Sequence, residues 1–296
     1  WPRRNSSGKR CSMTSRRMPS IRDRNRASRI LTYSFLTAVA IVDLLPFAWM
    51  LLSSLKSQGE IFQNPPTLFP KAFSLRNYAS AWKAGGLDFT RMFANSMIVA
   101  VPSTILCMIS SSLASFAFAR IRFAGREFLF MCFVAAIMMP AMMIIVPTFL
   151  LMKPFIDTFV PLIARVMFGL PFVIFLFRQF FMTIPKELDD AALVDGYSRF
   201  QIWWRIIMPL SKPVLATLVI FVFQQVYNDL TNPLIFINSK ANFTVQIGLA
   251  SFRGMYATRY DLLMAASVFT LAPILALFVA AQRYFVEGVV MTGLKG

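Results

Sequence analysis

Six long apolar runs constrain the fold of this chain more than any other feature of its sequence. A helix needs roughly 20 apolar residues to cross the hydrocarbon of a bilayer at 1.5 Å per residue. Each run has 24 to 27 residues, and together they make up about half of the 296-residue chain. We therefore predict an all-α polytopic membrane protein with six transmembrane helices. The runs are 31–55, 93–119, 128–152, 159–184, 214–237 and 262–286.

Composition supports this class and excludes several others. Hydrophobic residues make up 57% of the chain and charged residues only 15%, against about 25% in a soluble domain. This excludes a disordered chain, a disulfide scaffold and most soluble enzymes. The chain has no histidine, which removes histidine acid–base catalysis, Ser-His-Asp triads and histidine metal sites. Its three cysteines show no metal-ligand spacing, so we expect neither a metal site nor a cofactor.

The net charge of +17 is distributed as in a membrane protein, and we expect no nucleic-acid partner. Ten of the 30 basic residues lie in the segment 1–30, and most of the others lie between apolar runs. With the N-terminus inside, 20 basic residues fall on the cytoplasmic side and nine outside, while Arg165 lies within the fourth run. This excess predicts that both termini are cytoplasmic. The expected domains are a basic N-terminal cytoplasmic tail, 1–30, and a transmembrane domain, 31–296.

The first twelve residues are set apart from this fold. The chain begins with Trp1, and Met13 and Met18 are both suitable first residues. We expect residues 1–12 to be an over-extended gene start and leave them out of the fold. Without them the cytoplasmic side still carries 16 basic residues, so the predicted orientation is unchanged.

The inner loop 185–209 has the most informative local pattern. Acidic residues after Pro185 suit the positive end of a first short helix. Gly196 suits the left-handed stop of that helix, and Ser198 with Gln201 matches a capping box for a second one. Pro209 is expected to stop or bend the second helix before the fifth run. The acidic residues are Glu187, Asp189 and Asp190, and one helix face carries Leu188, Ala191, Ala192 and Asp195.

Two interpretations of this loop remain open from the pattern alone. It is either an amphipathic hairpin at the membrane surface without a partner, or a docking surface for another protein. In the second case the small side chains of Ala191 and Ala192 allow close approach and Gly196 sets the angle between the helices.

The loop resembles the conserved cytoplasmic motif of ABC-importer permeases, written E-A-A, three residues, Gly, nine residues, I-x-L-P. Here Asp190-Ala191-Ala192 takes the first place, Gly196 follows after three residues, and Ile206-Ile207-Met208-Pro209 follows after nine more. The departures are Asp for Glu at position 190 and Met for Leu at position 208. They preserve charge and shape respectively.

Other stretches resemble the carbohydrate branch of these permeases, the MalG-like subunits, over residues 31–296. The resemblance implies the type I ABC importer permease fold in a bacterial inner membrane. It also implies a second, MalF-like permease subunit, two ATP-binding subunits and an extracytoplasmic solute-binding protein. The resemblance further implies that the outer loop 244–260 contacts the solute-binding protein. The stretches are Phe177-Arg178-Gln179-Phe180-Phe181, Asn228-Asp229-Leu230 with Pro233-Leu234, and the tail 282–296.

The resemblance assigns contact with the ATP-binding subunits to the inner loop. No G-x-x-x-x-G-K-[ST] loop occurs in the chain, so ATP hydrolysis is expected in a partner and the chain itself is not expected to be an enzyme. The expected coupling residues are Glu187, Asp190, Ala191, Ala192, Asp195, Gly196, Ile206 and Pro209.

A polar strip interrupts the fifth run and is a candidate for the substrate path. Amides, carboxylates and aromatic faces bind sugars, and a charge within a membrane segment usually faces a cavity or a partner. The alternative is that Asp229 pairs with an arginine or with the sister subunit. The candidate residues of the path are Gln225, Asn228, Asp229 and Asn232.

Other residues have weaker signals. We expect Arg178 to extend toward lipid phosphates at the inner surface. Asp43 is a candidate partner for Arg165, although the sequence cannot pair them. The small residues of segment 110–115 suit close helix packing.

The sequence therefore predicts a permease subunit that imports a sugar or oligosaccharide by ATP-driven alternating access. A permease for glycerol phosphate or another polar solute is an alternative within the class. A second alternative is a secondary transporter driven by an ion gradient, for which Asp43 and Asp229 are the acidic candidates. A membrane-embedded enzyme lacks the required clusters of titratable groups.

Overall fold

The computed structural model describes residues 21–83, 86, 88–253 and 258–293, and it divides between Trp49 and Met50 into two units. The first unit consists of most of helix α1 (Ile21–Ser54), which covers the first apolar run. The second unit holds all later helices. Most of the predicted cytoplasmic tail and the last three residues lie outside the described residues.

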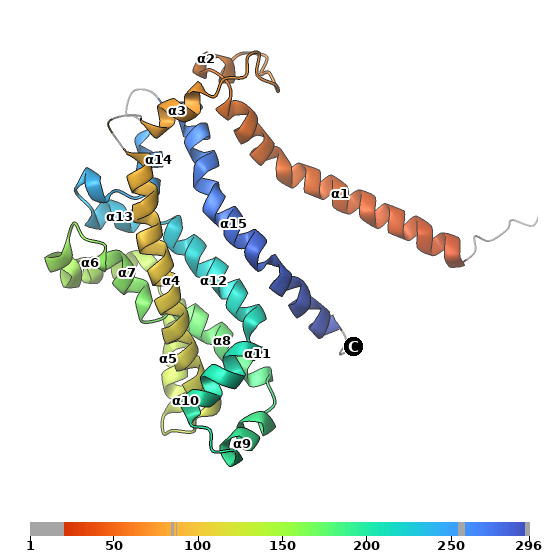
Figure 1. Cartoon of the computed structure of the whole chain (residues 1–296), viewed down its shortest axis with the longest axis vertical. Helices are drawn as coiled ribbons and strands as arrows, with labels where there is room; N and C mark the ends of the chain where they lie inside the picture. The colour runs from red at the N-terminus through yellow and green to blue at the C-terminus, as the bar shows by residue number, and fades with distance from the viewer. Residues whose placement is uncertain (1–20, 84–85, 87, 254–257, 294–296) are drawn as a thin grey trace, which may run out of the picture. The chain divides into compact units, whose positions relative to one another are not determined.

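The second unit is mainly helical, and the connection between α2 (Gln58–Ile61) and α3 (Arg76–Trp82), residues 62–75, is a long non-helical segment (Figure 1). Three short helices that lie between the apolar runs are α2, α3 and α14 (Val245–Ser251). Its long or apolar helices are α4 (Phe89–Arg120), α5 (Arg126–Ile137), α6 (Ala141–Met152), α7 (Val160–Met167), α8 (Pro171–Thr183), α12 (Lys212–Tyr227), α13 (Thr231–Phe236) and α15 (Tyr260–Gly293). Between α8 and α12 come α9 (Glu187–Val194), α10 (Arg199–Ile202) and α11 (Met208–Leu210).

Four helical segments of the described residues are long and apolar enough to cross a membrane, and two bent pairs raise the number to six if each pair is one span. The third run is not the single helix that the sequence suggested, because α5 and α6 meet at a bend of 105°. Pro140 lies at this break, and proline both lacks an amide hydrogen and disfavours helical geometry in the residue before it. Each half has 12 residues, too few to cross the bilayer alone.

The fourth and fifth runs are also interrupted. Gly169, with φ of +99°, and Pro171 separate α7 from α8, although Val160–Thr183 still qualifies as one span. In the fifth run, α12 ends at Tyr227 and α13 begins at Thr231. The residues between them include Asn228 and Asp229, two of the four predicted polar residues. Irregular backbone at membrane depth is tolerated where protein or water satisfies its polar groups.

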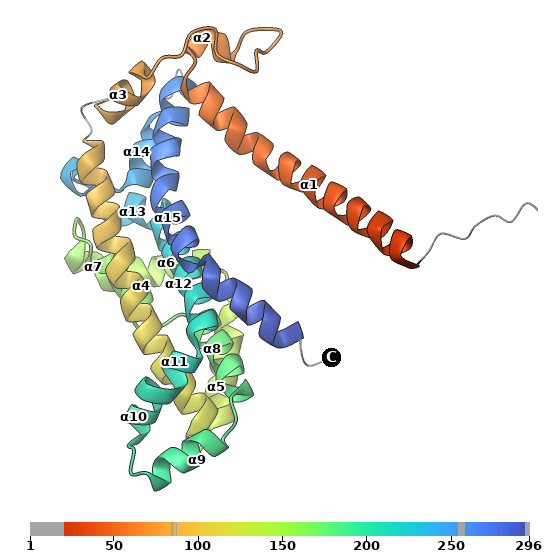
Figure 2. The same cartoon turned by 45° about the vertical axis from the view of Figure 1, so that its right-hand side comes forward.

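Helix α4 is the centre of the second unit and packs against α7, α8, α12 and α14 (Figure 2). Ser111 and Ser115 are fully buried, and the Ser115 hydroxyl donates to the Ile174 carbonyl of α8 at 2.8 Å. A Cβ at Gly169 would lie 2.9 Å from the Ser111 hydroxyl oxygen. The predicted small-residue patch is thus confirmed as the surface where α4 and the α7–α8 turn approach closely.

Asp157 joins two loops of the second unit, the one before α7 and the one after α13. Its carboxylate accepts the backbone amides of Asn238 at 3.0 Å and Ser239 at 2.8 Å, and it also accepts the Ser239 hydroxyl. Its own carbonyl accepts the side-chain amide of Asn242 at 2.7 Å. These donors favour the ionised carboxylate, and the Ser239 hydroxyl contributes most to holding the pKa of Asp157 below its usual value of 3.8.

Arg178 does not extend to the lipid surface as the sequence suggested. Its side chain is buried and its guanidinium pairs with the Glu127 carboxylate at 3.1 Å. The same group lies 3.8 Å from the centre of the Phe130 ring and donates to the Phe118 carbonyl at 3.3 Å. A carboxylate, a ring face and a carbonyl replace the phosphate that snorkelling would have supplied.

Candidate coupling hairpin and polar pocket

The segment 185–209, hereafter the 185–209 hairpin, begins with a helix that ends in a glycine turn. Helix α9 carries the three predicted acidic residues in its first turn. At its end the Gly196 amide donates to the Leu193 carbonyl at 3.1 Å, and the Tyr197 amide donates to the Ala192 carbonyl at 2.9 Å. With φ of +82° at Gly196, this is the Schellman arrangement. The predicted left-handed stop is confirmed.

The second half of the hairpin starts with the predicted capping box. The Ser198 hydroxyl accepts the Gln201 amide at 3.3 Å, and the Gln201 side chain accepts the Ser198 amide at 2.8 Å. A π-helical turn, Trp203–Ile207, follows α10 and leads into α11. The chain then turns by 84° into α12, with Ser211 at the junction, two residues after the predicted bend at Pro209.

Most of the predicted coupling residues lie on the exposed side of the hairpin. Ala192 is the exception, since it is 5% exposed and packs against the chain's own core. It therefore does not share the exposed surface with Ala191, as the docking interpretation expected. Val194, which sequence reasoning did not select, is 88% exposed. The exposed residues are Glu187, Asp190, Ala191, Asp195, Gly196 and Pro209, while Ile206 is half-buried.

An ion pair that sequence reasoning missed holds the hairpin to the bundle. Asp189, on the inner side of α9, lies 3.5 Å from the guanidinium of Arg120 at the end of α4. Both side chains are buried, at 7% and 1% exposure respectively. Burial raises the pKa of Asp189 by more than the charge of Arg120 lowers it. The two residues are 69 positions apart, and no local pattern in the sequence connects them.

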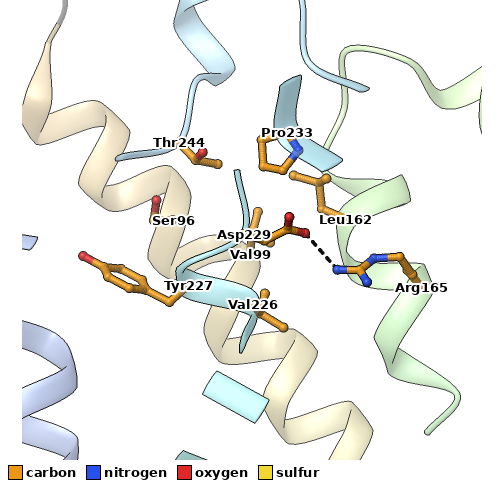
Figure 3. Close-up of a pocket in the computed structure, with 9 residues that line it drawn as sticks. All are labelled: Ser96, Val99, Leu162, Arg165, Val226, Tyr227, Asp229, Pro233 and Thr244. Carbon is orange, nitrogen blue, oxygen red and sulfur yellow. Dashed lines mark hydrogen bonds and ion pairs between the residues drawn. The ribbon is translucent and has the colours of Figure 1, made fainter. Parts of the chain in front are cut away.

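A small pocket surrounds the break between α12 and α13 (Figure 3). At its centre the Arg165 guanidinium of α7 donates to the Asp229 carboxylate at 2.9 Å. Asp229 also accepts the backbone amide of Asn232 at 3.2 Å and its side-chain amide at 2.6 Å. The lining residues are Ser96, Val99, Leu162, Arg165, Val226, Tyr227, Asp229, Pro233 and Thr244.

The four predicted substrate-path residues do not converge on this pocket. Asp229 and Asn232 lie together at the break and are partly buried, whereas Gln225 and Asn228 are exposed. The Asn228 side chain accepts the amide of Gln246 in α14 at 3.1 Å. Asp229 has an arginine partner within the chain, as the alternative to the substrate-path interpretation expected, and that partner is the Arg165 that we had considered for Asp43.

Comparisons with known proteins agree with this architecture. A model of the family described as binding-protein-dependent transport system inner membrane component matches residues 108–290. The chain is 33% identical, over 91% of its length and 97% of the relative's, to the arabinooligosaccharides transport system permease protein AraQ of Halalkalibacterium halodurans. It is 30% identical, over 88% of its length and 86% of the relative's, to the diacetylchitobiose uptake system permease protein NgcG of Streptomyces coelicolor.

The fold also matches a solved structure. A chain of a bacterial ABC transporter involved in the import of the acidic polysaccharide alginate superposes with a TM-score of 0.74. The match covers 90% of this chain and 99% of that one at 21% identity. The interrupted apolar helices and the match to the family model over more than half of the sequence lead to one conclusion. The chain belongs to the binding-protein-dependent transport system inner membrane components, the multi-pass permease subunits of ABC transporters.

Proposed function

We propose that this chain is one of two pore-forming subunits of an ATP-driven importer for a sugar or oligosaccharide in a bacterial inner membrane. Both termini would face the cytoplasm, and the partners would be a second permease, two ATP-binding subunits and an extracytoplasmic solute-binding protein. Relatives whose names specify arabinooligosaccharides and diacetylchitobiose support a carbohydrate over glycerol phosphate. A related alginate importer with a substrate-bound periplasmic protein supports the binding-protein partner.

The observation that carries the proposal is the exposed side of the 185–209 hairpin. Its helix begins with acidic side chains, its turn is fixed by Gly196, and Ala191 and Val194 leave an apolar surface in water. A partner that buries this surface gains hydrophobic stabilisation without having to order the hairpin first. ATP-driven closure of the ATPase pair would then shift the hairpin, and the helices would alternate between inward-open and outward-open states.

The ion pair in the polar pocket argues against an ion-driven secondary transporter. Such a transporter needs an acidic group within the membrane that is free to bind and release the driving ion. Asp229 is instead bound by Arg165 and Asn232.

A pull-down tests the proposal. The chain is co-expressed with the products of its neighbouring genes, and wild type is compared with Gly196→Asp. A Cβ at Gly196 meets nothing within 4 Å, so the change causes no steric clash. It adds backbone strain, because φ is +82° at this position, and it adds a charge at the exposed turn. Gly59→Asp, at an outer-loop glycine with similar free space, is the control.

We expect a P-loop ATPase to co-purify with wild type and Gly59→Asp and to be lost with Gly196→Asp. If no ATPase binds wild type, and liposomes holding the chain alone accumulate solute under an ion gradient, the importer proposal is wrong. If the ATPase does co-purify with wild type, binding of radiolabelled oligosaccharides to the partner solute-binding protein identifies the substrate class.

A further inference from the structure

Arg120 lies where the 185–209 hairpin meets the helix bundle. It is the last residue of α4, and its Nη2 group donates to the carbonyls of Phe181 and Ile184, each at 2.7 Å. These carbonyls belong to the last turn and the C-cap of α8. The Phe181 carbonyl also accepts the backbone amide of Ile184 at 3.3 Å, and the dipole of α8 favours a cation at this end. One side chain thus joins the ends of α4 and α8.

The other amino group of Arg120 faces α9. Its Nη1 atom lies 3.5 Å from Oδ2 of Asp189. Within the described part of the chain, Nη1 and Nε of Arg120 and Oδ1 of Asp189 have no hydrogen-bond partner. Lys186 and Arg199 also attract the Asp189 carboxylate, and Asp190 repels it. Because the pair is buried, removal of either partner leaves a charge that water does not compensate.

Helix α9 has few other connections to the bundle. Of its eight residues only Asp189 and Ala192 are buried. Ala192 contributes a methyl group, whose contact has no preferred direction. The ion pair therefore provides the directional contact between α9 and the rest of the unit. Figure 2 shows α9 beyond the ends of α4 and α8. The Arg120 guanidinium contacts both α8 and α9 from the end of α4.

We propose that Arg120 is a positioning residue that makes α9 move as one body with α4 and α8. This inference rests on the proposed function, in which a partner ATPase displaces the hairpin. A helix held only by its loops would turn without moving the bundle. Through Arg120, a displacement of α9 is passed directly to two apolar helices, so that ATP hydrolysis is linked to opening and closing of the pore.

Four variants test the role of the contact. Arg120→Gln and Asp189→Asn each remove one charge, and Arg120→Lys retains the charge without the planar fork. Arg126→Gln is the matched control, because Arg126 lies at the same end of the bundle but is 29% exposed and pairs with Glu127.

The first measurement needs no partner protein. Trypsin cleavage of the purified chain after Lys186 and Arg199 is followed by mass spectrometry. Loss of the buried pair should free the hairpin and speed this cleavage about tenfold in Arg120→Gln and Asp189→Asn. Arg120→Lys should lie close to wild type, and Arg126→Gln should equal it. Wild-type cleavage rates in both Arg120→Gln and Asp189→Asn would overturn the proposal.

The second measurement is the amount of solute transported per ATP hydrolysed by the assembled complex in liposomes. In Arg120→Gln and Asp189→Asn this ratio should fall about tenfold while the ATPase stays bound, because the exposed side of the hairpin is intact. Arg120→Lys should restore most of the ratio, which a mere loss of folded protein would not allow. An unchanged ratio in both charge-removal variants overturns the positioning role alone, whereas absence of ATPase from wild type overturns the proposed function as well.

Discussion

Arg165 and Asp229 form an ion pair across 64 positions of sequence, with Nη2 of Arg165 2.9 Å from Oδ2 of Asp229. The pair joins α7 to the break between α12 and α13, where the fifth apolar run is interrupted. Side-chain exposures of 27% and 16% place it between the surface and the core. The pair therefore fixes the geometry at the point where the helices themselves are discontinuous.

A double-mutant cycle measures the strength of this pair. Arg165→Gln and Asp229→Asn should each lower the free energy of unfolding, because each leaves a partly buried charge without its partner. The double variant should lose less than the sum of the two, by about 1 kcal/mol. Denaturant titration in detergent gives all four values. Additive effects would show that the two side chains are not coupled.

Ala191 and Ala192 are adjacent residues with opposite environments, and they separate docking from folding. Ala191→Glu adds a charge to the exposed side of the hairpin, so it should abolish co-purification of the ATPase with little change in thermal stability. Ala192→Glu buries a charge beneath the hairpin, so it should lower stability by about 3 kcal/mol or more. Thermal unfolding and pull-down of both variants test this. Equal loss of stability in both would contradict the described burial.

Ser115 sets the distance between α4 and α8. Ser115→Leu should destabilise the protein by about 1–3 kcal/mol, because the added volume pushes the two helices apart. Ser115→Ala removes the hydroxyl, which donates to the carbonyls of Ile174 and Ser111, and should cost about 0.6 kcal/mol. The exposed neighbour Leu113 provides the control, since Leu113→Ala removes side-chain volume from an exposed position and should change stability little. Apparent melting temperatures in one detergent rank the three variants.

The ionisation of Asp157 predicts how the stability of the folded state changes with pH. Its folded pKa lies below 3.8, so the folded state binds this proton more weakly than the unfolded state does. The stabilisation is thus complete above pH 3.8 and is lost as the pH falls from 3.8 through the folded pKa. Asp157→Asn should remove this part of the pH dependence, and Ser239→Ala should move the folded pKa back toward 3.8. Melting temperatures measured across about pH 3–7 test both expectations.

The local features of the 185–209 hairpin could be predicted because they depend on neighbouring residues. A capping box needs residues three apart, and the stop at Gly196 needs only a residue that tolerates positive φ. The same short range explains why the apolar runs were found. The bend at Pro140 was less predictable, since a proline in a membrane helix breaks it or is accommodated according to its neighbours.

The contacts between the helices could not be predicted from the sequence. Arg120, Arg165 and Arg178 are similar residues near or within apolar runs, and each finds its carboxylate more than 50 positions away. The pattern identified none of the partners, because charge complementarity alone fits many pairings. The expectation that Arg178 reaches lipid was wrong for this reason, since Glu127 and Phe130 could be placed beside it only by the fold.

The buried guanidinium groups of Arg120 and Arg178 have different surroundings at two stages in the life of the chain. During insertion the helices have not yet packed, and in the orientation that we predict both arginines count among the positive charges that resist translocation. After packing, neither charge is available to the membrane surface, because carboxylates and carbonyls enclose it. Replacing either residue with a neutral one therefore removes one positive charge during insertion and a structural contact after packing, while the excess of basic residues on the predicted cytoplasmic side remains.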